Sequence, residues 1–327
     1  MVPWFIENGI DPHIIGDNNE TLLFDAGDGK AVRYLLEKGL DPNHKNEFGR
    51  LALFTTQDEA SVQAMIEYGL DLEKVEKETE QAVILTMIGN FAGEGALKAV
   101  LESGKVDTSP ATLQSALVLA AHFDNDKLIR FLVQYGADVN QPEVRMRSDG
   151  APDSTMPLMA TTLGDQAKAA KVLLELGADP NGGDHSGQFL KNAMANGCQK
   201  VAKLLREAGA KGVGDLAYQI VLRDEAAIQA LLEKAPSYDT SPEFWDRVMV
   251  EAARTGHRGV IEAALQKGVP LFKDRKFMCS SDNPYRTAAA EGQHEVLELL
   301  IAPAQRGGRG HMAEGRTAWG SMELQPL

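Results

Sequence analysis

The side chains that most often carry out chemistry in proteins are scattered along this chain of 327 residues. Its seven histidines stand at positions 13, 44, 122, 185, 257, 294 and 311, and no two of them have the His-Glu-x-x-His spacing that holds zinc on one helix. The sequence also lacks a Cys-x-x-Cys pair, a Gly-x-Ser-x-Gly nucleophile turn and a P-loop. These observations predict a protein that is not an enzyme, with no metal site and no cofactor.

A recurring phrase indicates which elements the chain is built from. It reads YLLEKGLDPN at 34–43, FLVQYGADVN at 131–140 and VLLELGADPN at 172–181, and its glycines recur every 30 to 41 residues from Gly9 to Gly209. In each copy an apolar helix ends at a glycine, which enters the left-handed region without a Cβ clash. Asp, Pro and Asn then form a turn. Self-similarity at this period predicts a repeat array.

A second, shorter apolar stretch precedes each copy of the phrase. Examples are residues 115–121, 156–162, 247–253 and 283–289. Alanines at the end of this stretch allow a neighbouring helix to approach closely. Each repeat is therefore expected to be a short helix, a turn, a longer helix and a hairpin.

This pattern resembles the ankyrin repeat, whose units read G-x-T-P-L-H-x-A-A, then G-H-x-E, then G-A-D-V-N. Gly256-His257 and the run at 292–300 match the middle of the unit, and His257 is implied to hold the turn between helices. The histidine of T-P-L-H is replaced in this chain by Phe24, Phe54, Val118, Met159 and Val250. The first helices in the units at 14–43 and 46–69 are about three residues short.

The resemblance implies an all-α solenoid of about ten diverged repeats. We expect one array over residues 1–305, with an insertion at 142–155 that lengthens one hairpin, and then a basic, glycine-rich loop and an incomplete repeat over 306–327. Insertions in such arrays map to loops on one face, often the binding face; the alternative is a neutral extension of the loop. The mixed charges at 73–80 predict a solvated loop and a helix start.

Charge restricts the class of partner. The net charge is −14, from 47 acidic and 33 basic side chains, so nucleic-acid phosphates would be repelled and a protein partner with a basic surface is favoured. No apolar run approaches the length of a membrane helix, and the N-terminal MVPWFIENG lacks the regions of a signal peptide. We expect a cytoplasmic monomer without membrane insertion.

The two cysteines, Cys198 and Cys279, lie about three repeats apart. Neighbouring helices are roughly 8–10 Å apart, whereas a disulfide needs Cα atoms within about 7 Å. A bridge within the chain is therefore not expected. Free thiols suit a reducing compartment, and we expect neither cysteine to be catalytic.

The resemblance implies binding through the hairpin tips and the inner surface of the first helices. The exposed inner positions are expected just before the mid-repeat glycine, where Phe91, Phe123 and Leu163 would line up as an apolar stripe, unless they tuck against the next hairpin. Arg145, Met146 and Arg147 of the insertion would overhang it. The full set of candidates for partner binding is Asn90, Phe91, His122, Phe123, Arg145, Met146, Arg147, Leu163, Asn196, Arg254 and Glu291.

The leading prediction for function is a non-enzymatic module for protein–protein interaction. One alternative is an inhibitor or immunity-type protein that blocks the active site of a toxin or enzyme, which the acidic charge and the overhanging loop would suit. Another is the targeting or scaffold part of a larger effector protein. The sequence leaves all three open.

Overall fold

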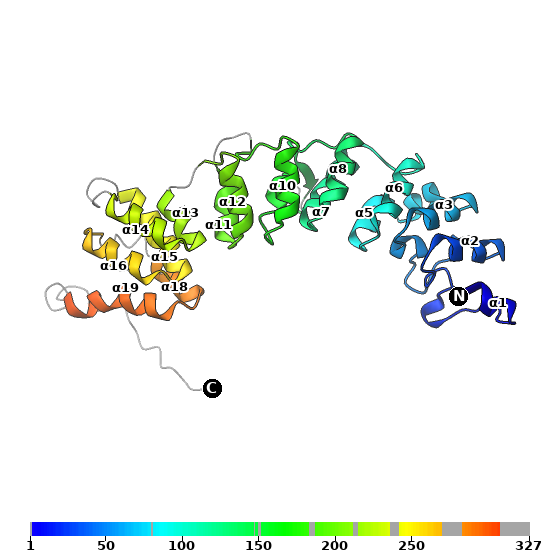
Figure 1. The fold of residues 1–327 in the computed structure, drawn as a ribbon, viewed down its shortest axis with the longest axis horizontal. Coiled ribbons are helices and arrows are strands. Elements are labelled where there is room, and N and C mark those ends of the chain that lie inside the picture. The colour runs from blue at the N-terminus through cyan, green and yellow to red at the C-terminus, as the bar shows by residue number, and fades with distance from the viewer. Residues whose placement is uncertain are drawn as a thin grey trace, which may run out of the picture. The chain divides into compact units, whose positions relative to one another are not determined.

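A computed structural model describes residues 2–79, 81–146, 148–149, 152–182, 187–211, 215–235, 242–269 and 283–307 (Figure 1). Contacts between residues divide the chain into two compact units, Met1–Gly212 and Val213–Leu327, and each is described by itself. Each unit is a stack of helix–turn–helix repeats, as predicted. Continuity of the array from 1 to 305 stays a prediction, and the expected terminal repeat lies almost wholly outside the described residues.

Unit 1 opens with degenerate repeats and continues with regular ones. Its early elements are α1 (Val2–Glu7), η1 (Asp17–Asn19), α2 (Gly29–Glu37), η2 (Ala52–Thr55), α3 (Glu59–Glu67) and α4 (Leu72–Thr79). Four helix pairs follow: α5 (Val83–Gly89) with α6 (Glu94–Glu102), α7 (Pro110–His122) with α8 (Asp126–Gln134), α9 (Pro157–Ala160) with α10 (Ala167–Glu175), and α11 (Gln188–Ala195) with α12 (Gln199–Glu207).

The helices of unit 1 lie in two layers. The first helices η2, α5, α7, α9 and α11 contact one another in sequence, and so do the second helices α2, α3, α6, α8, α10 and α12. Small residues permit this close stacking, since Ala116, Ala120 and Ala121 of α7 are all buried. We call the layer that contains α5, α7, α9 and α11 the first-helix layer, and the opposite one the second-helix layer.

Local sequence explains where these helices begin and end. Asp28, Asp58 and Asn125 precede α2, α3 and α8, and each side chain accepts hydrogen bonds from backbone N–H groups of the first turn. The helices end at the repeated glycine, as at Gly39 with φ 93° and Gly136 with φ 103°, where a side chain would be strained. The recurring phrase therefore marks helix ends, as expected.

An asparagine at the end of each full phrase ties one hairpin to the next. The amide of Asn140 donates to Gly177 O at 2.9 Å, and its oxygen accepts from Asp179 N at 2.8 Å. Asn43 makes the same pair of bonds to Gly69 and Asp71. Asn181 bonds Gly209 O and Lys211 N in the same way. These asparagines were expected as turn residues, and the structure shows that they also hold successive repeats together.

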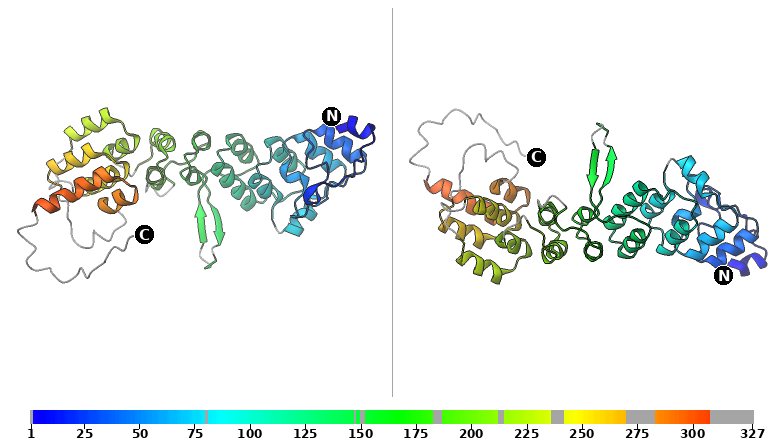
Figure 2. Two further views of the ribbon diagram at one scale, coloured as in Figure 1. Left: turned by 90° about the horizontal axis from the view of Figure 1, so that it is seen from below. Right: turned by 90° about the horizontal axis from the view of Figure 1, so that it is seen from above.

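The insertion forms a two-stranded hairpin. Strands β1 (Glu143–Met146) and β2 (Pro152–Thr155) pair antiparallel, with Glu143 opposite Thr155 and Arg145 opposite Asp153. In the described ranges, this small sheet and two isolated β-bridges, between Ile15 and Thr21 and between Lys45 and Leu51, are the β structure in an otherwise helical fold. The hairpin projects from the helices of unit 1 in both views of Figure 2.

Two expectations about the N-terminal repeats have different outcomes. Residues 22–25 form only turns, and η2 is a single 3-10 turn, which confirms that the first helices of these two repeats are shortened. Of the expectation of a solvated loop and a helix start at 73–80, the helix is confirmed and most of its side chains are exposed, but the loop is wrong over residues 73–79. These residues lie in α4, where Val75 is buried against the array. The buried apolar residues of α4, Leu72 and Val75, are only two and stand three positions apart, so their helical pattern is hard to recognise among so many charges.

Unit 2 contains three further helix pairs in its described part. They are α13 (Asp215–Leu222) with α14 (Glu225–Glu233), α15 (Pro242–Thr255) with α16 (Arg258–Gln266), and α18 (Pro284–Ala290) with α19 (His294–Gly307). Their core is built around Trp245, which is fully buried together with Ile220, Ile261 and Leu300.

Candidate binding surface

Two aromatic side chains meet on the surface of unit 1. The rings of Phe91 and Phe123 lie edge to face, with 5.0 Å between their centroids. Their exposed fractions are 68% and 38%, which is high for aromatic residues. The rings therefore pack against each other and not under a neighbouring hairpin, and they present apolar area to solvent.

The two phenylalanines do not occupy equivalent positions of their repeats. Phe91 has a φ of 58°, in the left-handed position that Asp124, Asp165, Gly197 and Gly256 take in other repeats. In its own repeat, Phe123 stands one position before the left-handed residue Asp124. Leu163 stands two positions before the left-handed residue Asp165. The expected stripe of equivalent residues is therefore wrong in its register. The error arose because no glycine marks the turn in the repeats of Phe91 and Phe123.

The left-handed conformation of Phe91 is held by the preceding repeat. Its carbonyl accepts a hydrogen bond from Gln57 Nε2 at 3.2 Å, and the N–H of Gly93 donates to Thr56 O at 3.1 Å. A Cβ on Gly93 would lie 1.9 Å from Gln57 O, so the two backbones approach as closely as glycine permits. A bulky residue at positive φ is an outlier that costs free energy, and such strain gathers at functional sites.

Leu163 lines a groove between the hairpin and the first-helix layer. The groove has a volume of about 260 Å³ and is lined by Val118, Leu119, His122, Glu143, Arg145, Asp153, Thr155, Ala160 and Leu163. Leu163 is 60% exposed. His122 joins this groove to the aromatic pair, since its ring lies 5.2 Å from that of Phe123. The structure thus brings Phe91, His122, Phe123 and Leu163 into one surface.

The hairpin contributes one of its predicted residues to the groove but not the other. Arg145 lines it, and its Nε donates to Glu143 Oε1 at 2.6 Å. Side chains alternate along a strand, so Val144 and Met146 point from the opposite face of the hairpin. Met146 is 70% exposed there, and the expectation that it overhangs the same surface is wrong. Arg147 lies outside the described residues.

The remaining candidates have local roles. Asn90 and Asn196 end α5 and α11, and their amides donate to the carbonyls of Thr86 and Thr162. Arg254 and Glu291 belong to unit 2. Glu291 is exposed, whereas Arg254 is only partly exposed and lies 3.3 Å from Glu251 Oε2. Arg254 is thus less available to a partner than the sequence suggests.

The first-helix layer carries almost no charge, which the search for individual residues missed. Helices α5, α7 and α9 contain no Asp, Glu, Lys or Arg, whereas α6, α8 and α10 on the other layer each contain several. Leu85, Leu119 and Met159 add partly exposed apolar area beside Phe91, Phe123 and Leu163. This signal was readable in the sequence once the helices were assigned to layers. We call these six apolar side chains the first-helix face.

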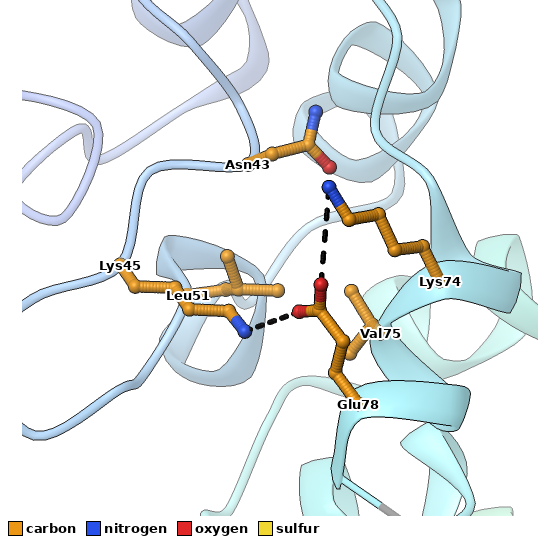
Figure 3. A pocket seen from close by; sticks show the side chains of 6 residues that line it. All are labelled: Asn43, Lys45, Leu51, Lys74, Val75 and Glu78. Atoms are coloured by element: carbon orange, nitrogen blue, oxygen red, sulfur yellow. Dashed lines mark hydrogen bonds and ion pairs between the residues drawn. The ribbon is translucent and has the colours of Figure 1, made fainter.

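A second hollow lies where α4 packs on the preceding repeat. Figure 3 shows Glu78 between Lys45 and Lys74, with Asn43, Leu51 and Val75 around them. Glu78 Oε2 lies 2.5 Å from Lys45 Nζ, and this hydrogen bond is the main cause that lowers the pKa of Glu78. Both lysines already face a carboxylate, so these residues form a tie between repeats and offer no reactive group.

The surroundings of Cys198 and His257 favour a structural role for both residues over a catalytic one. The buried thiol of Cys198 donates to Thr162 O at 3.1 Å, and burial raises its pKa, so the reactive thiolate is disfavoured. Cys279 lies outside the described residues. His257 precedes α16 and lies 3.5 Å from Glu225 of the neighbouring repeat. Among the described residues, no group of three or more His, Cys, Asp or Glu is placed to hold a metal ion.

Comparison with known proteins identifies one repeat directly. Residues 112–143, which contain α7 without its first two residues, the whole of α8 and the first residue of β1, match the family model of the ankyrin repeat. No curated protein matches the chain. Within the part of the chain that is described, none of the helices combines the length and the apolar character that spanning a bilayer requires.

Proposed function

The chain is an ankyrin-repeat protein, and from that premise we propose that it is a non-enzymatic module that holds a protein partner against the first-helix face of unit 1. Ankyrin repeats are generally modules for protein–protein interaction. The observation that carries the proposal is the exposed aromatic pair of Phe91 and Phe123 at a strained backbone position. Glycine would adopt the φ of 58° at position 91 without the cost that a side chain incurs, so an aromatic residue there points to a functional use.

The energetics of burial support this surface as a binding site. Exposed aromatic side chains that a partner buries act as hot spots, each worth roughly 2 kcal/mol or more. The groove next to the pair supplies apolar area from Leu119 and Leu163, and the ion pair of Arg145 with Glu143 supplies a polar rim. An apolar centre with a polar rim is the usual anatomy of a protein interface.

Affinity capture with matched variants tests the proposal. Tagged wild-type chain, a Phe91→Ala/Phe123→Ala double variant and a Phe48→Ala control are exposed to the same lysate, and bound proteins are quantified by mass spectrometry. Phe48 is an exposed aromatic residue outside the first-helix face. The proposal expects a protein that the wild type and Phe48→Ala retain and the double variant loses. Equal retention by a folded double variant contradicts it.

A further inference from the structure

The lack of charged residues on α5, α7 and α9 restricts what a partner presents to this face. A charged side chain buried against α5, α7 or α9 would find no opposite charge on these helices, and burying an unpaired charge is costly. The contact must therefore be apolar at its centre. Leu85, Leu119, Met159 and Leu163 provide the matching apolar side chains next to the aromatic pair.

Threonine and asparagine side chains around this face are already used within the array. The hydroxyl of Thr86 donates to the carbonyl of Ala82, and the hydroxyl of the fully buried Thr162 donates to the carbonyl of Met159. The amides of Asn90 and Asn196 donate to backbone carbonyls as well. An extended segment laid on this face would leave many backbone N–H and C=O groups without partners, whereas a helix satisfies its own.

Charge around the face adds a second restriction. Arg145 is paired with Glu143, which leaves Asp153 as the unpaired charged side chain among the described residues that line the groove. The whole chain carries a net charge of −14, so a cationic partner approaches faster than an anionic one. Positive charge is therefore favoured on the part of the partner that stays in solvent.

We infer that the first-helix face takes the apolar side of a cationic, amphipathic α-helix. Such a helix places apolar residues at i, i+3, i+4 and i+7 and keeps its lysines or arginines in solvent. The inference rests on the proposed function and adds the kind of element that is bound.

Two synthetic peptides of leucine and lysine separate helix from strand. Both have about 18 residues, or about 27 Å of helix, and identical composition and charge. One has its leucines at helical spacing, and the other alternates leucine and lysine as a strand would. Each is titrated against the wild-type chain, a Leu163→Gln variant and an Ile14→Gln control by fluorescence anisotropy. Ile14 is exposed and belongs to unit 1 outside this face, and neither substitution changes the charge.

The inference expects the helical peptide to bind about tenfold tighter than the alternating one, with about a tenfold loss in Leu163→Gln and none in Ile14→Gln. If both peptides bind the wild type equally and both bind Leu163→Gln more weakly, peptides do bind the first-helix face, but the preference for a helical partner is contradicted. If neither binds, or Leu163→Gln has no effect on either, the inference is overturned. The proposed function is judged separately, by capture with the double variant.

Discussion

Phe91 and Phe123 bring their rings to 5.0 Å of each other from different positions of neighbouring repeats. Phe91 does so by taking the left-handed backbone position that other repeats fill with glycine, aspartate or arginine. An array that stacks identical units would not produce this contact. The pair is a local deviation from the repeat, on the face that carries no charged helix residue.

Substitution at position 91 should separate the effect of backbone strain on stability from the effect of losing the aromatic ring. Phe91→Gly and Phe91→Ala both remove the aromatic contact, but only glycine adopts a φ of 58° without strain. We expect Phe91→Gly to be more stable than Phe91→Ala by about 1 kcal/mol. Urea unfolding followed by circular dichroism measures the difference. Equal stability of the two variants would mean that this backbone is not left-handed in solution.

The close backbone approach at Gly93 makes a second prediction. Gly93→Ala places a methyl group against the Gln57 carbonyl, and the forced shift should cost about 1–3 kcal/mol. Gly89→Ala is the matched control, because a Cβ there meets nothing within 4 Å. Gly89 ends α5, so the control should be neutral or stabilising by up to about 1 kcal/mol. Thermal melts of both variants measure this difference in stability. A Gly93→Ala variant as stable as the wild type would contradict the close approach of the two backbones.

The thiol of Cys198 should react only when the array opens. In a Cys279→Ser background we expect Ellman's reagent to label Cys198 slowly in buffer and rapidly in denaturant, because the group is buried and its pKa is raised. A chain with Ala195→Cys and Cys198→Ala in the same background gives the control, since Ala195 is exposed one turn away. Labelling of Cys198 as fast as that of the control would disprove its burial.

Asp107 should make part of the stability depend on pH. Its pKa is lowered chiefly by a hydrogen bond from the Thr112 hydroxyl, and then by the N–H of Ser109. A lowered carboxyl pKa stabilises the fold above the ordinary aspartate pKa of about 3.9, and this contribution is lost as pH falls through the folded value.

Substitution of Thr112 tests this dependence. Thr112→Val should be less stable than the wild type at neutral pH, and the gap should narrow below about pH 4. Thr112→Ser keeps the hydroxyl and should keep the low pKa. An NMR titration of the Asp107 carboxyl reads the pKa directly. A pKa that does not rise in Thr112→Val would remove Thr112 as the cause.

Sequence reasoning succeeded where one residue type has one structural use. The glycines at 39 and 136 end helices, and Ala116, Ala120 and Ala121 of α7 are buried between neighbours. It failed where different residues fill one conformation. Phe91, Asp124 and Arg223 all adopt the left-handed position of glycine, so counting from glycine misplaced the expected stripe. The direction of Met146 could not be predicted either, because strand register in an insertion is set by its turn and not by the repeat.

Hydroxyl-radical footprinting of side chains tests the central claim most directly, once a partner has been captured. The chain is oxidised alone and in complex, and the oxidation of each side chain is read by mass spectrometry. Phe91, Phe123 and Leu163 should be protected in the complex. Trp4 and Phe48, which are 61% and 65% exposed in unit 1, should stay reactive. Unchanged oxidation of Phe91, Phe123 and Leu163, with protection elsewhere, would show that the partner does not bind the first-helix face.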